Sequence, residues 1–385
     1  MPLVSLIIPA RNEANTICEA IQGAEAAFKD MDLDGEVIVA DSSTDGTSSI
    51  AAECGAKVIK PKNLGYGNAY LAGFQEAHGT YIVLMDGDMT YDPLEIKKVL
   101  SPLQNGSCDM VIGSRLKGEM QPGSMPALHR YIGNPFLTWS LNNLFAIGIS
   151  DAHCGFRAIT RQGLDRLHLR TGGMEFASEM VIEAALKGLR IHEVPISYYP
   201  RRGKSKLNSF SDGWRHLRFM MLYRPVPFLF IPGLVALLVG LALTLMVQLQ
   251  GWSRMHSMIL AGLLLLTGYQ LLLAGLYFGA YGETYGISRS STFARKLMSY
   301  HSLEKELVMG IILLIAGIAL GARILLLWNA AGFGTLYEIQ TATIAMILTI
   351  LGIQTIFSGM FISLLLLSNE NQVLESRSNE NSIHL

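Results

Sequence analysis

Charged residues are scarce in this sequence, and the scarcity is uneven along the chain. Of the 385 residues, 16% are charged and 50% are hydrophobic, whereas a typical globular chain carries about 25% charged residues. Residues 1–224 hold most of the charge, and residues 225–367 are overwhelmingly apolar. This distribution excludes a single soluble domain and predicts a polar N-terminal part followed by a membrane part. The net charge of −1 gives no reason to expect a nucleic-acid partner.

Cysteine is rare as well. The sequence has 4 cysteines, which lie far apart and show no C-x-x-C spacing: Cys18, Cys54, Cys108 and Cys154. Such spacing suggests neither a zinc site nor a disulfide framework. We therefore expect reduced thiols in a cytosolic domain.

The N-terminal sequence does not predict a secretory signal peptide either. The apolar run Val4–Ile8 is too short for a signal peptide, and no basic residues precede it. We interpret this run as a buried first strand. The N-terminal domain is therefore expected to stay on the side of the membrane where it is made.

Short apolar runs alternate with helical patterns in the first part of the chain. Helical patterns cover Ala14–Lys29 and Gly67–Ala77. Continuous apolar runs are typical of strands that are buried on both faces. The alternation predicts an α/β domain with a mainly parallel sheet, whose ligand lies at the carboxyl ends of the strands. The predicted strands are Val4–Ile8, Val37–Ala40, Val58–Ile59, Tyr81–Met85 and Met110–Ile112.

The second part of the chain contains four long apolar segments. A helix needs about 20 apolar residues to cross a hydrocarbon core of about 30 Å, and each segment reaches that length. We expect an all-α transmembrane domain of four helices over residues 225–367, between a domain at 1–224 and a polar tail at 368–385. The predicted spans are Phe228–Leu249, Met258–Ala280, Leu307–Trp328 and Thr341–Leu367.

The basic residues of the connecting loops predict the orientation in the membrane. One side carries only Arg254, and the other carries seven basic residues near the spans. Because basic residues favour the cytosolic side, the N-terminal domain and both termini are expected in the cytosol. The membrane is expected to be a prokaryotic plasma membrane, or the endoplasmic reticulum in a eukaryote. The seven residues are Arg215, Arg218, Arg224, Arg289, Arg295, Lys296 and Lys305.

Two further stretches have an apolar face without being long enough to span. In Phe210–Leu222 the apolar face holds Phe210, Trp214, Leu217 and Met221. The stretch at about 131–149 has a similar face with Phe136, Trp139, Leu144 and Phe145. These faces indicate helices at the membrane surface; helices packed on the sheet are the alternative.

The strongest candidate site is Asp86-Gly87-Asp88, directly after the predicted strand Tyr81–Met85. Two carboxylates separated by one small residue can hold Mg²⁺ or Mn²⁺, which favour oxygen ligands and share their remaining positions with water and phosphates. Such an ion stabilises a departing nucleoside diphosphate as a Lewis acid. The pattern is weak alone and gains strength from the buried strand before it.

Other polar residues follow the first two predicted strands. Pro9, Arg11, Asn12 and Glu13 lie at the end of the first strand, and Asp41 ends the second. We expect them at the ligand-facing edge of the sheet, with Asp41 placed to bond a nucleoside. For Asp45, a helix cap is the competing interpretation.

Several motifs in a fixed order resemble one family. They are P-A-R-N-E, D-S-S-T-D-G-T, N-L-G-Y-G-N-A, M-D-G-D-M, I-G-S-R, D-A-H-C-G-F-R-A and E-V-P-I, within about residues 3–206. Together they resemble the family 2 glycosyltransferases of GT-A fold, in the branch of the dolichyl-phosphate mannosyltransferases and polyprenyl-phosphate glycosyltransferases. Members of that branch carry two or four C-terminal spans, which is in keeping with the four predicted here.

The resemblance also implies roles for individual residues. Asp86 and Asp88 would hold the metal, with Asp88 central to catalysis, and Asn12, Glu13 and Asp41 would contact the nucleotide. The family often has Gln at the position of Thr90, and the Thr90 hydroxyl is expected to reach the ion instead. The family often has a second Asp at the position of Ala40, and this difference leaves the donor open.

The expected acceptor is a phosphate rather than an alcohol. A phosphate monoester has its second pKa near 6 and is already an anion at neutral pH, so it needs cations to aim it rather than a general base. The resemblance assigns acceptor contacts to Arg115 and Arg130, and phosphate contacts to the basic segment Arg201–Lys206, which holds Arg202, Lys204 and Lys206. A patch that attracts anionic lipid is the alternative for that segment.

Arg157 and Glu179 have competing interpretations. Arg157 is either a phosphate ligand or a structural ion-pair partner, and Glu179 is either a base, an anchor for a cation, or neither.

The sequence therefore predicts metal-dependent, inverting transfer of a hexose from a nucleotide sugar of GDP-mannose or UDP-glucose type to a polyprenyl phosphate. A processive polysaccharide synthase is the alternative, although the sequence lacks a Q-x-x-R-W motif. A lipid-binding scaffold with an inactive transferase domain is a third hypothesis. The expected partners are the nucleotide sugar, the polyprenyl phosphate and the bilayer, and assembly as a homo-oligomer stays open.

Overall fold

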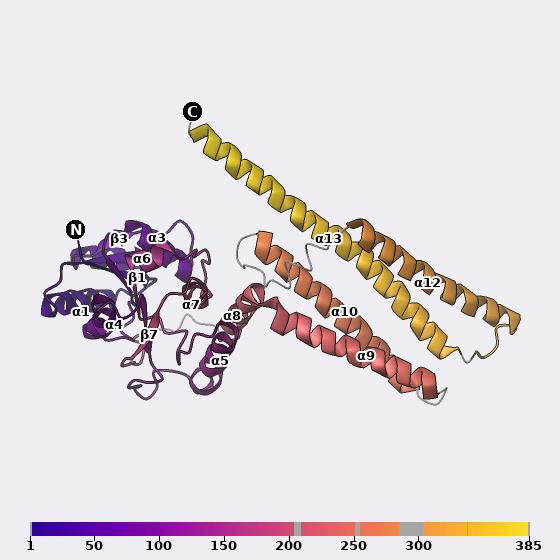
Figure 1. Cartoon of the computed structure of the whole chain (residues 1–385). Helices are drawn as coiled ribbons and strands as arrows, with labels where there is room; N and C mark the ends of the chain where they lie inside the picture. The colour runs from indigo at the N-terminus through magenta and orange to yellow at the C-terminus, as the bar shows by residue number, and fades with distance from the viewer. Residues whose placement is uncertain (1, 204–208, 251–254, 285–302, 337, 384–385) are drawn as a thin grey trace. The chain divides into compact units, whose positions relative to one another are not determined.

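A computed structural model describes residues 2–203, 209–250, 255–284, 303–336 and 338–383 of the chain. The chain folds into two compact units, Met1–Phe219 and Met220–Leu385. The first is an α/β unit, and the second consists of long apolar helices (Figure 1).

The first unit is built on a seven-stranded sheet with the strand order β3-β2-β1-β4-β6-β5-β7. All neighbouring pairs are parallel except those that β6 makes with β4 and β5. The predicted mainly parallel sheet is therefore confirmed. The strands are β1 Val4–Ala10, β2 Gly35–Asp41, β3 Lys57–Ile59, β4 Tyr81–Leu84, β5 Met110–Ser114, β6 Arg157–Thr160 and β7 Ile191–Pro195.

The central strands are apolar on both faces because helices cover both faces. Ile7 of β1 lies against Gly73 of α3, whereas the next residue, Ile8, lies near Ile17 of α1 on the other face. Both isoleucines are fully buried. Successive side chains of a strand point to opposite faces, so a continuous apolar run is required here.

The helices of the first unit connect the strands. Those predicted at Ala14–Lys29 and Gly67–Ala77 are present as α1 and α3. α1 and α4 lie together against one face of the sheet, and α3 lies with α7 (Figure 1). The helices are α1 Ile17–Asp30, α2 Thr47–Glu53, α3 Tyr66–Glu76, η1 Pro93–Glu95, α4 Ile96–Gln104, η2 His129–Gly133, α5 Asn134–Phe145, α6 Arg161–Asp165, α7 Phe176–Leu186 and α8 Ser209–Tyr223.

The expectation of reduced thiols is wrong for two of the cysteines. Cys18 of α1 and Cys54, at the end of α2, form a disulfide, with their Cα atoms 5.7 Å apart. β1 and β2 are neighbours in the sheet, so the helices that follow them also lie side by side. A separation of 36 residues carries no such signal. Cys108 and Cys154 are free, as expected, and both are buried.

The two stretches expected at the membrane surface are helical. In and around α5, four large apolar side chains are more than half exposed: Tyr131 at 69%, Ile132 at 62%, Phe136 at 51% and Trp139 at 63%. Phe145 was expected on the same face, and this is wrong, because it is only 9% exposed and packs into the unit.

α8 corresponds to the other stretch, and its Trp214 is 52% exposed. Leu217 and Met221, expected on the same face, are half-buried.

Among its described residues, the second unit contains four helices long and apolar enough to cross a membrane: Val226–Leu249, His256–Gly282, Leu303–Ala330 and Ile339–Leu365. They confirm the four predicted segments. The first begins in a short turn, η3 Val226–Phe230, which leads into α9 Ile231–Gln250. The others belong to α10 Met255–Thr284, α12 Leu303–Ala330 and α13 Ile339–Ile383.

Glycine brings these helices close together. A Cβ atom at Gly268 of α10 would lie 2.7 Å from the carbonyl oxygen of Gly233 in α9. One at Gly352 of α13 would lie 2.8 Å from the carbonyl oxygen of Gly310 in α12. Small residues allow such close packing in lipid, where the hydrophobic effect does not drive helices together.

Four of the basic residues used to predict the orientation (Arg254, Arg289, Arg295 and Lys296) lie outside the described residues.

Candidate active site

The carboxyl ends of the parallel strands place the predicted site residues at one edge of the sheet. Glu13 follows β1, Asp41 ends β2, Asp86 and Asp88 follow β4, and Arg115 follows β5. β1 lies between β2 and β4, so the polar segments after these three strands are neighbours. In open α/β sheets this edge is where ligands bind.

Asp88 is buried and held by contacts on both of its oxygens. Its Oδ1 accepts hydrogen bonds from the backbone N–H of Thr90 at 3.1 Å and from the Thr90 hydroxyl at 2.6 Å. Its Oδ2 lies 2.5 Å from Nε of Arg201. Met89, which lies between Asp88 and Thr90 in the chain, has a φ of 59°. This value is unusual for a residue with a side chain. Such backbone strain is often found at functional sites.

Asp86 is partly exposed, whereas Asp88 is buried. Its Oδ2 is 2.8 Å from the position that a Cβ atom would occupy at Gly155, and the hydroxyl of Tyr66 is 3.0 Å from the same position. Burial and, next, the negative charge of Asp88 raise the pKa of Asp86 from 3.8 to about 7. A carboxylate whose pKa is raised by a second carboxylate in this way favours a nearby cation.

The donor set fits a hard divalent cation that shares its ligands with a substrate. Among the described residues, no group of three or more His, Cys, Asp or Glu side chains is gathered for a metal. Mg²⁺ needs no such group, because it is usually bound by one or two carboxylates together with water and substrate phosphates. Asp86 and Asp88 supply two carboxylates, and a guanidinium already lies against Asp88. This site therefore suits Mg²⁺ or Mn²⁺.

The loops after β1 and β2 are joined by hydrogen bonds. The backbone N–H of Asn12 donates to Ser43 Oγ at 2.7 Å, and the Asn12 side-chain oxygen accepts from the N–H of Thr44 at 2.9 Å. The N–H of Glu13 donates to the hydroxyl of Thr47 at 3.0 Å. Asn12 itself has a φ of 55°. The two predicted nucleotide-contacting loops thus form one continuous surface.

Asp41 and Asp45 order the second of these loops. The Asp41 carboxylate accepts hydrogen bonds from Ser43 and Ser48 and is buried. Asp45 accepts from the backbone N–H of Thr47 at 3.0 Å and from its hydroxyl at 2.5 Å. Asp45 therefore bonds the first residue of α2, although the N-cap position itself is Gly46.

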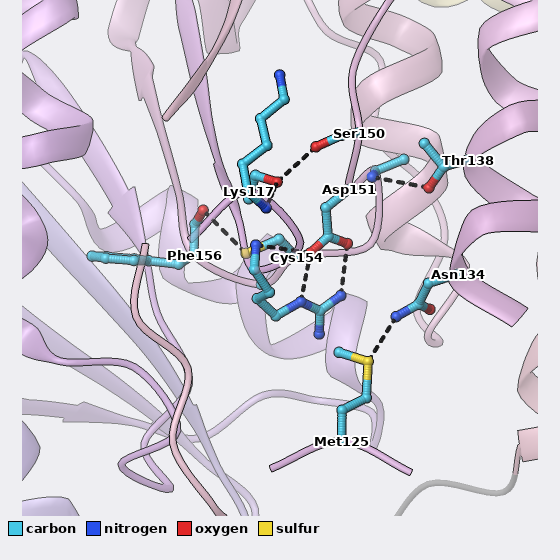
Figure 2. A network of polar contacts seen from close by, with 12 residues as sticks. Lys117, Met125, Asn134, Thr138, Ser150, Asp151, Cys154 and Phe156 are labelled. Atoms are coloured by element: carbon cyan, nitrogen blue, oxygen red, sulfur yellow. Dashed lines mark hydrogen bonds and ion pairs between the residues drawn. The ribbon is translucent and has the colours of Figure 1, made fainter. Parts of the chain in front are cut away.

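Arg115 is engaged by a buried carboxylate. Its Nε lies 2.7 Å from Oδ2 of Asp151 and its Nη2 lies 2.8 Å from Oδ1, which is a bidentate pair. The Arg115 guanidinium also lies over the ring of Tyr198, 5.2 Å from its centroid. Figure 2 shows Asp151 within the surrounding network, between Ser150 and Thr138. An arginine has five N–H donors, so this pairing leaves some of them available.

The other predicted residues have separate contacts. The Arg130 guanidinium lies over the ring of Tyr131, 5.3 Å from its centroid. Arg202 pairs with Glu19 of α1 at 2.5 Å. Pro9 is within β1, and Arg11 is exposed in the loop that follows it. Lys204 and Lys206 lie outside the described residues.

Arg157 and Glu179 have structural roles. Arg157 is 2% exposed and donates to the carbonyl oxygens of Cys154, Ala177 and Ala152. Glu179 is 2% exposed, and its carboxylate accepts from the backbone N–H groups of Arg170 and Thr171. Both side chains bond to the backbone of neighbouring segments; the partners of Arg157 are carbonyl oxygens rather than the carboxylate expected of an ion pair.

A buried polar chain joins α8 to the rest of the unit. Ser178 Oγ lies 2.8 Å from Nδ1 of His216 and 3.1 Å from Nε2 of His153. Burial, followed by the positive charge of Arg157, lowers the pKa of His216 to about 4. Burial and the charge of His216 lower the pKa of His153 as well. Both rings are thus neutral at pH 7.

Three residues of the site were not among the predicted ones, and a fourth, Arg201, was predicted for phosphate contacts instead. Tyr66 and Gly155 surround Asp86, Asp151 holds Arg115, and Arg201 pairs with Asp88. Asp151 and Gly155 lie in the D-A-H-C-G-F-R-A motif, which therefore marked the region without identifying their roles. Arg201 was part of the basic segment, but nothing in its spacing indicates a contact with Asp88.

Models of two families match the chain. The one described as "Glycosyl transferase family 2" matches residues 5–167. The one described as "Glycosyltransferase family 2 C-terminal transmembrane region" matches residues 276–366. Together with the observed sheet and apolar helices, they confirm the resemblance and the expected fold class, a GT-A type α/β domain followed by transmembrane helices.

Curated relatives are similar over most of their own length. The chain is 41% identical to "Low-salt glycan biosynthesis hexosyltransferase Agl6" of Haloferax volcanii over 368 residues, which cover 93% of this chain and 88% of that protein. It is 32% identical to "Glycosyltransferase AglJ" of the same organism, over 71% of this chain and 91% of that protein. It is also 32% identical to a "Dolichyl-phosphate hexose transferase" of that organism, over 54% of this chain and 89% of that protein.

Proposed function

Because this chain belongs to glycosyltransferase family 2, we propose that it transfers a hexose from a nucleotide sugar to a polyprenyl phosphate at the membrane surface. The observation that carries the proposal is the pair of carboxylates, Asp86 and Asp88, at the ligand-facing edge of the sheet beside Arg201. A unit with four membrane-spanning helices in the same chain supports a lipid acceptor. A relative with a dolichyl-phosphate activity in its name supports the same acceptor class.

The donor is proposed to lie along the joined loops after β1 and β2. Asn12, Glu13 and Asp41 belong to these loops, and their backbone is ordered by the bonds to Ser43 and Thr47. The diphosphate would then extend toward Asp86 and Asp88. A divalent cation held there with the help of Thr90 would neutralise the departing nucleoside diphosphate.

The acceptor is proposed to react without a general base. Its phosphate oxygen attacks the anomeric carbon as the bond from that carbon to the nucleoside diphosphate breaks, so a single displacement inverts the configuration. The phosphate is already an anion at pH 7 and needs only to be aimed. Arg130 and the remaining donors of Arg115 are proposed for that task, since guanidinium groups suit phosphate oxygens.

Membrane contact of the catalytic unit is part of the proposal. The exposed apolar side chains in and around α5 form a patch that suits the lipid interface: Tyr131, Ile132, Phe136 and Trp139. Aromatic rings favour the boundary between headgroups and acyl chains. The catalytic residues have to reach an acceptor phosphate that its lipid chain holds at this boundary. We propose that this unit and both termini face the cytosol, as the basic residues near the spans predict.

The proposed reaction can be tested directly. Membranes containing the chain are incubated with a polyprenyl phosphate and a panel of radiolabelled nucleotide sugars. Label that moves into organic solvent as a monoglycosyl lipid identifies both donor and reaction. Replacing Asp88 with Asn is expected to lower the transfer rate by about 100-fold or more, because the leaving group loses its counter-charge.

A matched control uses the opposite edge of the sheet. Asp109 pairs with Arg190 at 2.9 Å near the start of β5, so Asp109→Asn makes the same chemical change away from the site. Its transfer rate should stay within a factor of two of the rate of the unaltered chain.

A long polymer as the product would support a polysaccharide synthase instead. Failure to bind any nucleotide sugar with Mg²⁺ or Mn²⁺ would support an inactive scaffold.

A further inference from the structure

Arg201 occupies the approach to the outer oxygen of Asp88. Its Nε lies 2.5 Å from Oδ2 of Asp88, and its Nη2 lies 4.0 Å from Oε1 of Glu13. The other Asp88 oxygen already accepts two hydrogen bonds from Thr90. The positive charge of Arg201 therefore lies beside the carboxylate that would attract a metal cation.

The fold, and not the ion pair alone, brings Arg201 there. The backbone N–H of Tyr199 donates to the carbonyl oxygen of Thr90 at 2.9 Å, which joins the segment after β7 to the loop that carries Asp88. Two residues earlier, Ser197 donates to the carboxylate of Glu95 through its N–H at 2.9 Å and its hydroxyl at 2.8 Å. These bonds hold the chain beside Asp88 whichever way the Arg201 side chain points.

Exposure leaves the arginine side chain room to move. The Arg201 side chain is 26% exposed, whereas that of Asp88 is 5% exposed. Two cations at one carboxylate oxygen repel each other at close range, and this repulsion offsets part of the attraction of each to the carboxylate. A divalent cation at Oδ2 of Asp88 is therefore bound more tightly once the guanidinium has left that oxygen.

We propose that Arg201 is a built-in substitute cation that competes with the divalent metal for Asp88. This inference rests on the proposed function, since it gives Asp88 the role of a metal ligand. The protein without donor then binds the metal weakly. A nucleoside diphosphate offers the displaced guanidinium new phosphate oxygens, so metal and nucleotide each strengthen the binding of the other, as linkage requires.

The test measures metal binding without donor or acceptor. Mn²⁺ is titrated into the detergent-solubilised full chain, and free Mn²⁺ is followed by electron paramagnetic resonance. Arg201→Gln should lower the Kd for Mn²⁺ by about tenfold, which corresponds to about 1.4 kcal/mol for the lost competition. Arg201→Lys keeps a cation near Asp88 and should stay close to the unaltered chain.

Arg202 provides the matched control. It is the next residue and carries the same charge, but it pairs with Glu19. Arg202→Gln should change the Kd for Mn²⁺ by less than a factor of two. Added nucleoside diphosphate should tighten Mn²⁺ binding in the unaltered chain by about tenfold more than in Arg201→Gln.

Three results would overturn the inference. Equal effects of the two glutamine substitutions would mean that only the general field of a positive charge matters. Weaker Mn²⁺ binding in Arg201→Gln would mean that Arg201 orders Asp88 for the metal. No Mn²⁺ binding in any variant would remove the competition altogether. Sugar transfer by the unaltered chain is measured separately, so the proposed function can stand when this inference fails.

Discussion

Reduction of the Cys18–Cys54 disulfide offers a quantitative test of the catalytic unit. The bond closes a loop with a sequence separation of 36 residues. Loop-closure entropy for about 36 residues is roughly 13 cal/mol/K, so the bond stabilises the unit by about 4 kcal/mol at 25 °C. For a unit of this size each kcal/mol moves the unfolding temperature by about 2–4 °C. Reduction should therefore lower it by roughly 8–16 °C.

The assay is differential scanning calorimetry of the full chain in detergent, with and without dithiothreitol. A thiol titration in denaturant precedes it. Of the 4 cysteines, two should react before reduction, namely the free Cys108 and Cys154, and all should react afterwards. In the double variant Cys18→Ser/Cys54→Ser, dithiothreitol should no longer shift the transition, whereas Cys108→Ser should keep the full shift.

Two results would refute this reasoning. Four reactive thiols before reduction would show that the bond is absent from the isolated protein. A shift below 2 °C with the bond present would show that loop closure does not control the stability of this unit. The bond also bears on the predicted cytosolic side, since cytosolic disulfides are rare except in hyperthermophiles. Protease protection of this unit in oriented vesicles tests that side independently.

Three further predictions concern the site and its surroundings. Asp151→Asn leaves the buried Arg115 without its carboxylate and should destabilise the unit by about 3 kcal/mol in denaturant unfolding, whereas adding Arg115→Met should recover part of that loss. His216 has a folded pKa of about 4, below its ordinary 6.5 because of burial. Its contribution is therefore fully present above pH 6.5 and is lost as the pH falls toward 4, by about 3 kcal/mol, which unfolding at stepped pH values checks. Gly155→Ala places a Cβ atom 2.8 Å from Oδ2 of Asp86 and should lower the transfer rate by about 100-fold; an unchanged rate would show that the carboxylate can move aside.

The sequence by itself determined the order and type of the main elements. Short apolar runs such as Val4–Ile8, which only Ser5 interrupts, are typical of strands buried on both faces, and four apolar segments of about 20 residues or more are typical of helices that cross a membrane. Asp86 and Asp88 were also identified from the sequence, because they follow a predicted strand. Parallel strands bring their carboxyl ends to one edge of the sheet, where ligands bind. These conclusions depend on local patterns, which need no knowledge of distant neighbours.

The direction and position of β6 could not be predicted from local sequence patterns. Its four residues, Arg157–Thr160, begin with a buried arginine and run antiparallel between β4 and β5. Neither its direction nor its place follows from its own residues. Both depend on which neighbouring strands remain to be paired.

Contacts between distant residues were decided only by the tertiary structure. Cys18 meets Cys54 because β1 and β2 are adjacent, and Asp151 meets Arg115 across 36 positions of sequence. Arg201 reaches Asp88 because the segment after β7 bonds to the loop after β4. Each pairing depends on strand order, and strand order is set by the packing of the whole unit. The carboxylate pair could therefore be found from the sequence, whereas the cation that lies against it could not.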